Sequence, residues 1–208
     1  MTGSFALAGA RIFDGAGLRH GRAVVVADGR IRAVLAEKEC PSGLPVRRIA
    51  GVLAPGFIDI QVNGGGGGLL NDQPTVEGVR AIAAAHRPYG TTGLLPTLVT
   101  DTREKMAAAI DAVRAALAEG VPGVLGIHLE GPFLNPERKG VHDPRLMRRI
   151  EPDDVALVTS LGAGRTLVTI APELTTPEVI ARIAATGVRL AAGHTTASYA
   201  VMEAARAA

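Results

Sequence analysis

The stretch GIHLEGPFLNPERKGVHDP, residues 126–144, shapes the interpretation of the whole chain. It begins as an apolar strand and continues as a polar loop that Gly and Pro interrupt. His128 and Glu130 stand at the end of the strand, and His142 follows on the loop. A carboxylate at the end of a buried strand needs a partner, because burying an unpaired charge costs several kcal/mol. The stretch therefore indicates a functional site and not only a connection.

The rest of the second part of the chain alternates between apolar strand-like runs and alanine-rich helical runs. Near-continuous apolar strands between helices indicate a parallel sheet that is buried on both faces. Such an order fits either an open doubly wound sheet or a (β/α)₈ barrel. We predict strands over 57–62, 91–98, 123–130, 166–171 and 188–193, and helices over 75–88, 102–118, 152–161 and 176–186, with a further helix starting at 198.

Polar residues at the carboxyl ends of these strands favour the barrel. Both architectures place their active sites at this edge of the sheet. Groups from the first, third and fifth strands can converge at a barrel mouth, whereas a flat sheet would hold them farther apart. We therefore predict an α/β fold, a TIM-like (β/α)₈ barrel that is truncated after about five strands. The residues concerned are Gln61 and Asn63 after the first strand, His128 and Glu130 after the third, Glu173 after the fourth and His194 after the fifth.

The first part of the chain has a different pattern. Short strand-like runs are separated by turns, and Asp28-Gly29 joins two of them in the way typical of a β-hairpin. We predict a small all-β, sandwich-like domain over residues 1–53 and a partial barrel over residues 54–208.

Composition narrows the class of protein. Of the 208 residues, 47% are hydrophobic and 3% aromatic, so the core must be built from Ala, Val, Leu and Ile. The 22 basic and 20 acidic residues are scattered, so nucleic acid is not an indicated partner. No apolar run reaches the ~18 residues of a membrane span. Cys40 is the single cysteine, which favours a reducing compartment and a cytoplasmic protein.

A divalent cation is one partner that would neutralise Glu130. His194 could supply a neutral nitrogen from a neighbouring strand end, and one carboxylate with imidazoles is a common catalytic zinc set. The alternative is a structural ion pair of Glu130 with a basic residue such as Lys139.

The other histidines have two interpretations each. His128 could be a further ligand, but a core histidine bonded to a neighbour is the favoured interpretation. His142 could reach over the barrel mouth as a substrate or oxyanion contact, or it could be a solvated loop residue. His20 and His86 are expected at the surface. The glycine run at 64–68 could let backbone approach a ligand closely, or it could be only a flexible loop.

Four stretches in the same order resemble the amidohydrolase superfamily and, within it, the N-acetylglucosamine-6-phosphate deacetylases. The resemblance covers nearly the whole chain, including the leading β unit. It implies a metal-dependent hydrolase that converts N-acetylglucosamine 6-phosphate into glucosamine 6-phosphate and acetate, and that forms a homodimer when complete. The stretches are LAPGFIDIQVNGGGG (53–67), GIHLEGPFLNPERKGVHDP (126–144), VTIAPE (168–173) and AAGHTTASY (191–199).

The resemblance also assigns roles by position. Glu130 and His194 match metal ligands of the family, and one Zn²⁺ is expected, with Fe²⁺ or Mn²⁺ as alternatives. Val141 and His142 match a substrate-contacting pair, with His142 near the acetyl carbonyl as a catalytic residue. In that position His142 would donate a hydrogen bond to the developing oxyanion.

Two departures from the family pattern affect these expectations. Many superfamily members carry His-x-His at the end of the first strand and bind a second metal there. This chain has Gln61 and Asn63 instead, so a mononuclear site is expected.

The family's remaining metal histidine and its catalytic aspartate have no counterpart up to Ala208, so we expect residues 1–208 alone to be inactive. The alternatives are another amidohydrolase, such as a cyclic-amide hydrolase, and a non-catalytic fragment that needs a C-terminal partner.

Overall fold

The computed structural model describes residues 3–208, which form two compact units. One unit ends at Gly56, and the other spans Phe57–Ala208.

The first unit consists of short strands in two sheets. Their orders are β5-β4-β1-β6 and β3-β2-β7. The predicted hairpin joins β4 to β5, and positive φ angles of 51° at Asp28 and 69° at Gly29 match a type I′ turn. Packing of the two sheets as a sandwich stays a prediction. The strands are β1 Phe5–Ala8, β2 Arg11–Phe13, β3 Leu18–Arg19, β4 Arg22–Ala27, β5 Arg30–Ala36, β6 Val46–Arg48 and β7 Val52–Leu53.

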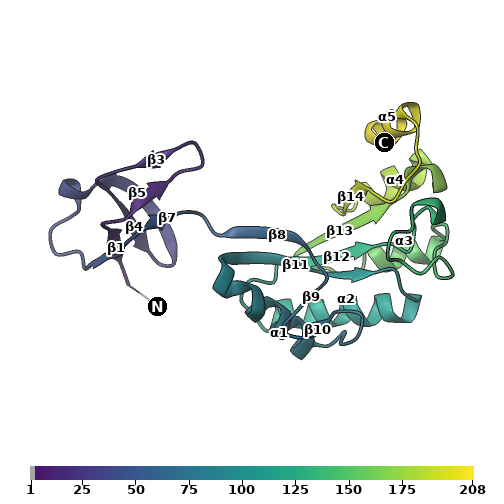
Figure 1. Cartoon of the computed structure of the whole chain (residues 1–208), viewed down its shortest axis with the longest axis horizontal. Coiled ribbons are helices and arrows are strands. Elements are labelled where there is room, and N and C mark those ends of the chain that lie inside the picture. The colour runs from purple at the N-terminus through teal and green to yellow at the C-terminus, as the bar shows by residue number, and fades with distance from the viewer. Residues whose placement is uncertain (1–2) are drawn as a thin grey trace. The chain divides into compact units, whose positions relative to one another are not determined.

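The second unit is built on a curled sheet of five parallel strands in the order β14-β13-β12-β11-β8 (Figure 1). Each strand pairs with the one that precedes or follows it along the chain, as in a barrel wall. A doubly wound sheet would instead reverse its order at a switch point. The α/β prediction is therefore confirmed, and the sheet matches a partial barrel. The strands are β8 Phe57–Val62, β11 Thr91–Val99, β12 Gly126–Glu130, β13 Arg165–Ile170 and β14 Arg189–Ala192.

The helices follow the strands as predicted, and several are shorter than the ranges predicted from the sequence. Thr75, Thr102, Thr176 and Ser198 each cap a helix, because the side-chain oxygen accepts a backbone N–H of the first turn. None of the described helices is long and apolar enough to cross a membrane. The helices are α1 Val76–His86, α2 Arg103–Ala118, α3 Pro152–Val158, α4 Pro177–Ala184 and α5 Tyr199–Ala207.

The core lies between the middle of the sheet and the first two helices. Every residue of β12 is buried, and α1 and α2 lie side by side along β11 and β12 (Figure 1). Small alanines on α2 allow this close approach. The edge strand β8 differs, because Phe57, Ile58 and Ile60 are 69%, 66% and 57% exposed. Apolar side chains on an edge strand mark a surface suited to further packing.

The glycine run forms a paired hairpin and not an open flexible loop. Strand β9 is Gly64–Gly65 and strand β10 is Gly68–Leu69. A Cβ on Gly64 would stand 2.3 Å from the carbonyl oxygen of Gly68, so a side chain does not fit there. The ring Nε2 of the half-buried His86 donates to the Gly64 carbonyl at 2.9 Å. His86 therefore anchors this hairpin and is not a simple surface residue.

Candidate metal centre

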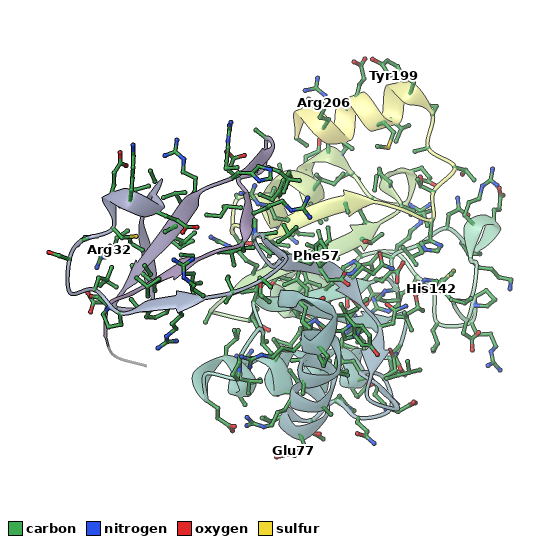
Figure 2. The ribbon with its side chains drawn as sticks, turned by 60° about the vertical axis from the view of Figure 1, so that its left-hand side comes forward. Arg32, Phe57, Glu77, His142, Tyr199 and Arg206 are labelled. Carbon is green, nitrogen blue, oxygen red and sulfur yellow. The ribbon has the colours of Figure 1, made fainter. Side chains whose placement is uncertain are left out.

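Three side chains from separate parts of the second unit converge beyond the carboxyl ends of the strands. Glu130 ends β12, His142 lies on the loop after it, and His194 follows β14. One candidate ligand atom from each lies within 4.8 Å of the others. The rings of His142 and His194 meet edge to face, with centroids 4.5 Å apart. Figure 2 labels His142 at this end, away from Phe57 at the start of β8.

Glu130 is buried, and its carboxylate faces the two histidines. Its Oε1 lies 3.3 Å from Nε2 of His194 and 3.9 Å from Nε2 of His142. The neighbouring His142 is the largest cause of a lowered pKa at Glu130, about 2, and it outweighs the opposing effect of burial. The alternative ion pair with Lys139 is not formed. The site therefore holds an ionised carboxylate at neutral pH.

His194 turns its Nε2 toward this carboxylate. Its Nδ1 lies 2.8 Å from the carbonyl oxygen of Arg138. A carbonyl only accepts, so Nδ1 carries the hydrogen and Nε2 of the neutral ring is free to bind a cation. Metal-binding histidines are commonly oriented in this way by a backbone carbonyl.

His142 has the opposite tautomer. Its Nδ1 lies 3.3 Å from the backbone nitrogen of Thr100 and 2.8 Å from the Thr100 hydroxyl. A backbone N–H only donates, so Nδ1 must accept and the hydrogen is on Nε2. His142 therefore turns a hydrogen-bond donor, and not a ligand atom, toward Glu130.

The position of His142 differs from the sequence-based expectation in one respect. It lies on the loop beyond the strand ends, yet only 4% of it is exposed. The alternative of a solvated loop histidine is wrong. Burial strengthens any hydrogen bond that Nε2 donates, because water does not compete for it.

The residues present fit a divalent cation. A buried carboxylate and an unprotonated imidazole nitrogen converge from strand ends that the sheet holds in place, and they are the borderline ligands that Zn²⁺, Fe²⁺ and Mn²⁺ accept. The described residues supply these two candidate ligands. Coordination positions would thus remain for further ligands, water or substrate.

His128 is a core residue. It is 2% exposed, and its two ring nitrogens lie 3.2 Å from the hydroxyl of Thr97 and 2.8 Å from that of Thr169. Burial lowers its pKa, although the charge of Glu130 acts in the other direction. Both nitrogens already have partners, so His128 is not available as a ligand.

The remaining predicted site residues lie at the surface. Val141 is 92% exposed, next to the buried His142. Gln61 and Asn63 are also exposed, and within residues 3–208 their side chains form no hydrogen bond with each other. Amides are poor ligands for transition metals, so we expect no second metal at these residues. This expectation stays a prediction.

A buried aspartate holds the far end of the loop that carries His142. Asp154 is fully buried, and its carboxylate accepts hydrogen bonds from Arg103, from both terminal nitrogens of Arg148 and from the N–H of Glu151. The Arg148 N–H in turn donates to the carbonyl of Pro132 at 3.1 Å. Burial opposes ionisation of Asp154, but the arginines outweigh it and lower its pKa.

Sequence reasoning missed two positioning residues. Thr100 follows β11, where a threonine after an apolar strand gave no sign of its contact with His142. Asn71 exchanges hydrogen bonds of 3.1 Å with the backbone N–H and carbonyl of Val99, and it donates to Asp101 at 2.9 Å. It ties the glycine hairpin to the end of β11, a contact that no local pattern indicates.

Comparison with known proteins places this site in context. The chain is 41% identical over 192 residues to the N-acetylgalactosamine-6-phosphate deacetylase of Shewanella sp. (strain ANA-3), covering 91% of this chain and 49% of that protein. It is 35% identical over 184 residues to the N-acetylglucosamine-6-phosphate deacetylase of Haemophilus influenzae, covering 88% and 48%. The chain thus spans about half the length of these curated relatives.

Solved structures show a similarity to the same group of proteins. The crystal structure of N-acetylglucosamine-6-phosphate deacetylase from Pasteurella multocida superposes with a TM-score of 0.90 at 31% identity, covering 98% of this chain and 54% of that one. Residues 52–208 match the amidohydrolase family. These residues are most of the chain and include every side chain of the candidate metal centre, so the chain belongs to the amidohydrolase family.

Proposed function

We propose that this chain is part of an enzyme that deacetylates N-acetylglucosamine 6-phosphate, giving glucosamine 6-phosphate and acetate. One observation carries the proposal: a carboxylate, an imidazole lone pair and an imidazole N–H face one another beyond the strand ends, contributed by Glu130, His194 and His142. The names of the relatives support the reaction and the substrate. Amide hydrolysis needs such a combination, because the carbonyl must be polarised and the developing oxyanion stabilised.

Glu130 and His194 would hold one divalent cation, and we propose Zn²⁺, with Fe²⁺ or Mn²⁺ as alternatives. When bound, such a cation polarises the acetyl carbonyl and lowers the pKa of water from 15.7 to roughly 7. Gln61 and Asn63 leave the site mononuclear.

His142 supplies the donor. Its Nε2–H is directed by the contacts of Nδ1 with Thr100, and we propose that it donates to the acetyl oxygen as negative charge develops there. The donor is fixed before the substrate arrives, so little reorganisation is needed during the reaction. The adjacent Val141 side chain, exposed on the same loop, would contact the substrate.

One observation favours N-acetylgalactosamine 6-phosphate as an alternative substrate. The Shewanella relative, at 41% identity, is named for N-acetylgalactosamine 6-phosphate. The two sugars differ only in the configuration of one ring hydroxyl, and both carry the same acetamide and phosphate. Comparing kcat/KM for the two sugars distinguishes the candidates.

The proposal includes the cellular compartment and the oligomeric state of the enzyme. We propose a cytoplasmic protein that forms a homodimer when complete, and sedimentation of the complete enzyme tests the dimer. Cys40 is free, which is consistent with a reducing compartment.

The test of the function is acetate release by the complete enzyme, purified with Zn²⁺. We expect turnover of an N-acetylhexosamine 6-phosphate that Glu130→Gln abolishes. Glu137→Gln is the matched control, because Glu137 is an exposed carboxylate on the same loop. Turnover that survives in Glu130→Gln, or no acetate release from either sugar by the unmodified enzyme, would contradict the proposal.

A further inference from the structure

Glu173 stands after β13, between the two strands that supply Glu130 and His194. By its place it resembles a third ligand, but its carboxylate is already occupied. Oε1 lies 2.9 Å from the side-chain nitrogen of Asn135, 2.7 Å from the backbone nitrogen of Thr196 and 3.2 Å from its hydroxyl. Oε2 accepts a short hydrogen bond from the hydroxyl of Thr195. Three donors thus contact Oε1 and one contacts Oε2, and Glu173 is not part of the cluster of candidate ligand atoms formed by Glu130, His142 and His194.

The residue that these contacts surround is His194. Its φ angle is +49°, a left-handed conformation that a residue with a side chain rarely adopts. Thr195 and Thr196 follow it directly, and both are bonded to Glu173. Such a conformation persists when neighbouring contacts fix it, and the short segment after β14 has no helix or strand of its own to do so.

Asn135 extends the network to the other side of the site. It lies on the loop after β12, its side chain donates to both Glu173 and Thr196, and its backbone N–H donates to the carbonyl of His194 at 3.0 Å. Asn135 is 8% exposed, so these bonds are largely shielded from water. The loop that follows Glu130 and the segment that carries His194 are thereby fastened to one carboxylate.

We propose that Glu173 is a positioning residue for the metal centre: it fixes the left-handed backbone of His194, so that Nδ1 meets the Arg138 carbonyl and Nε2 faces Glu130. This inference rests on the proposed metal site. Glu173 must be ionised to accept all four contacts. Burial opposes this, but the bonds from Thr195, Asn135 and Thr196 outweigh it and lower the pKa of Glu173 to about 2. Glu173 is therefore ionised at neutral pH, as the four contacts require.

The experiment measures the affinity of Zn²⁺ by competition with a chelator of known affinity, in the complete protein. Glu173→Gln keeps the size of the side chain but turns an amide NH₂ toward groups that donate. We expect affinity to fall about 10–100-fold, the usual effect of losing a group that orients a metal ligand. Glu178→Gln, an exposed carboxylate on α4, should bind as the unmodified protein does.

A second pair of variants guards against a general loss of folding. Thr195→Val removes the hydroxyl that Glu173 binds, and Thr195→Ser retains it. We expect Thr195→Val to bind Zn²⁺ about 10-fold more weakly and Thr195→Ser to restore the affinity, with thermal unfolding in excess chelator similar for both. Tight binding by both Glu173→Gln and Thr195→Val would overturn the positioning role. Absence of binding by the unmodified protein would instead overturn the metal site itself.

Discussion

Nε2 of His194 lies 3.3 Å from Oε1 of Glu130, although 64 residues separate them and strand β13 runs between their strands. Adjacent strands are ~4.8 Å apart, so β12 and β14 would be roughly 10 Å apart in a flat sheet. The curl of the sheet and the segment that extends beyond β14 close this gap. The pair thus depends on the barrel-like curvature, and the two candidate ligands meet only when β12, β13 and β14 are assembled.

His142→Gln should lower kcat of the complete enzyme about 10²–10³-fold, the effect of losing one oxyanion donor. The amide of Gln is shorter in reach and is not fixed by Thr100, so it does not replace Nε2–H. Steady-state kinetics with saturating sugar phosphate measures the effect. An unchanged kcat would remove His142 from the chemistry.

Thr100→Val should weaken the preference of His142 for the Nε2–H tautomer, because it removes the hydroxyl that lies 2.8 Å from Nδ1. The backbone N–H of residue 100 remains, so we expect a fall in kcat of about 10-fold or less, the value of one hydrogen bond. Thr100→Ser is the matched control and should behave as the unmodified enzyme. Long-range ¹H–¹⁵N NMR of the imidazoles reports the tautomer directly, and an Nδ1–H signal for His142 in the unmodified protein would refute the assignment.

Asp154→Asn should destabilise the second unit by about 1.5–3 kcal/mol, the range for hydrogen bonds to charged groups. The loss stays below that of a fully buried ion pair, because the Arg103 and Arg148 side chains are 37% and 29% exposed and keep part of their hydration. Denaturant unfolding at pH 7 measures it. The exposed neighbour gives the control variant, Asp153→Asn, which should change stability little.

The same variant has a defined pH dependence. The pKa of Asp154 is lowered in the folded state from its ordinary value of 3.8, so the folded state favours the ionised form. Its contribution is complete well above pH 3.8 and is lost as the pH falls through the lowered pKa. The difference between the unmodified protein and Asp154→Asn should therefore shrink in acid. A difference that grows below pH 3.8 would contradict this assignment.

Residues 1–208 alone should release no acetate from N-acetylglucosamine 6-phosphate in saturating Zn²⁺. The described residues contribute two candidate metal ligands and one candidate donor, but no further carboxylate at the cluster to carry a proton. Strands β8 and β14 also end the five-stranded sheet, and β8 exposes Phe57, Ile58 and Ile60. Robust turnover by a chain that mass spectrometry shows to end at Ala208 would contradict this expectation.

The strand and helix pattern was predictable because each element has a local cause. The apolar run of β12 and the threonine caps of α1 and α2 lie within the segments that they organise. The convergence of Glu130 and His194 was also predictable, since both follow parallel strands and so lie at the same edge.

The tautomers of the histidines were not predictable. They depend on one backbone N–H of Thr100 and one carbonyl of Arg138, and sequence does not indicate which main-chain group a ring will meet. Glu173 shows the same limit. Its place after a strand indicates only that it lies at the carboxyl edge of the sheet, and its role emerges from the contacts of both oxygens with Asn135, Thr195 and Thr196.

The most direct test of the central claim is the metal content of the complete enzyme and three variants after dialysis against trace Zn²⁺. Glu130 and His194 are assigned as ligands, and His142 as a donor that does not touch the metal. We predict that the unmodified enzyme retains a single cation per chain, that Glu130→Gln and His194→Gln lose it, and that His142→Gln keeps it. Full occupancy in Glu130→Gln, or loss of the metal from His142→Gln, would contradict the account.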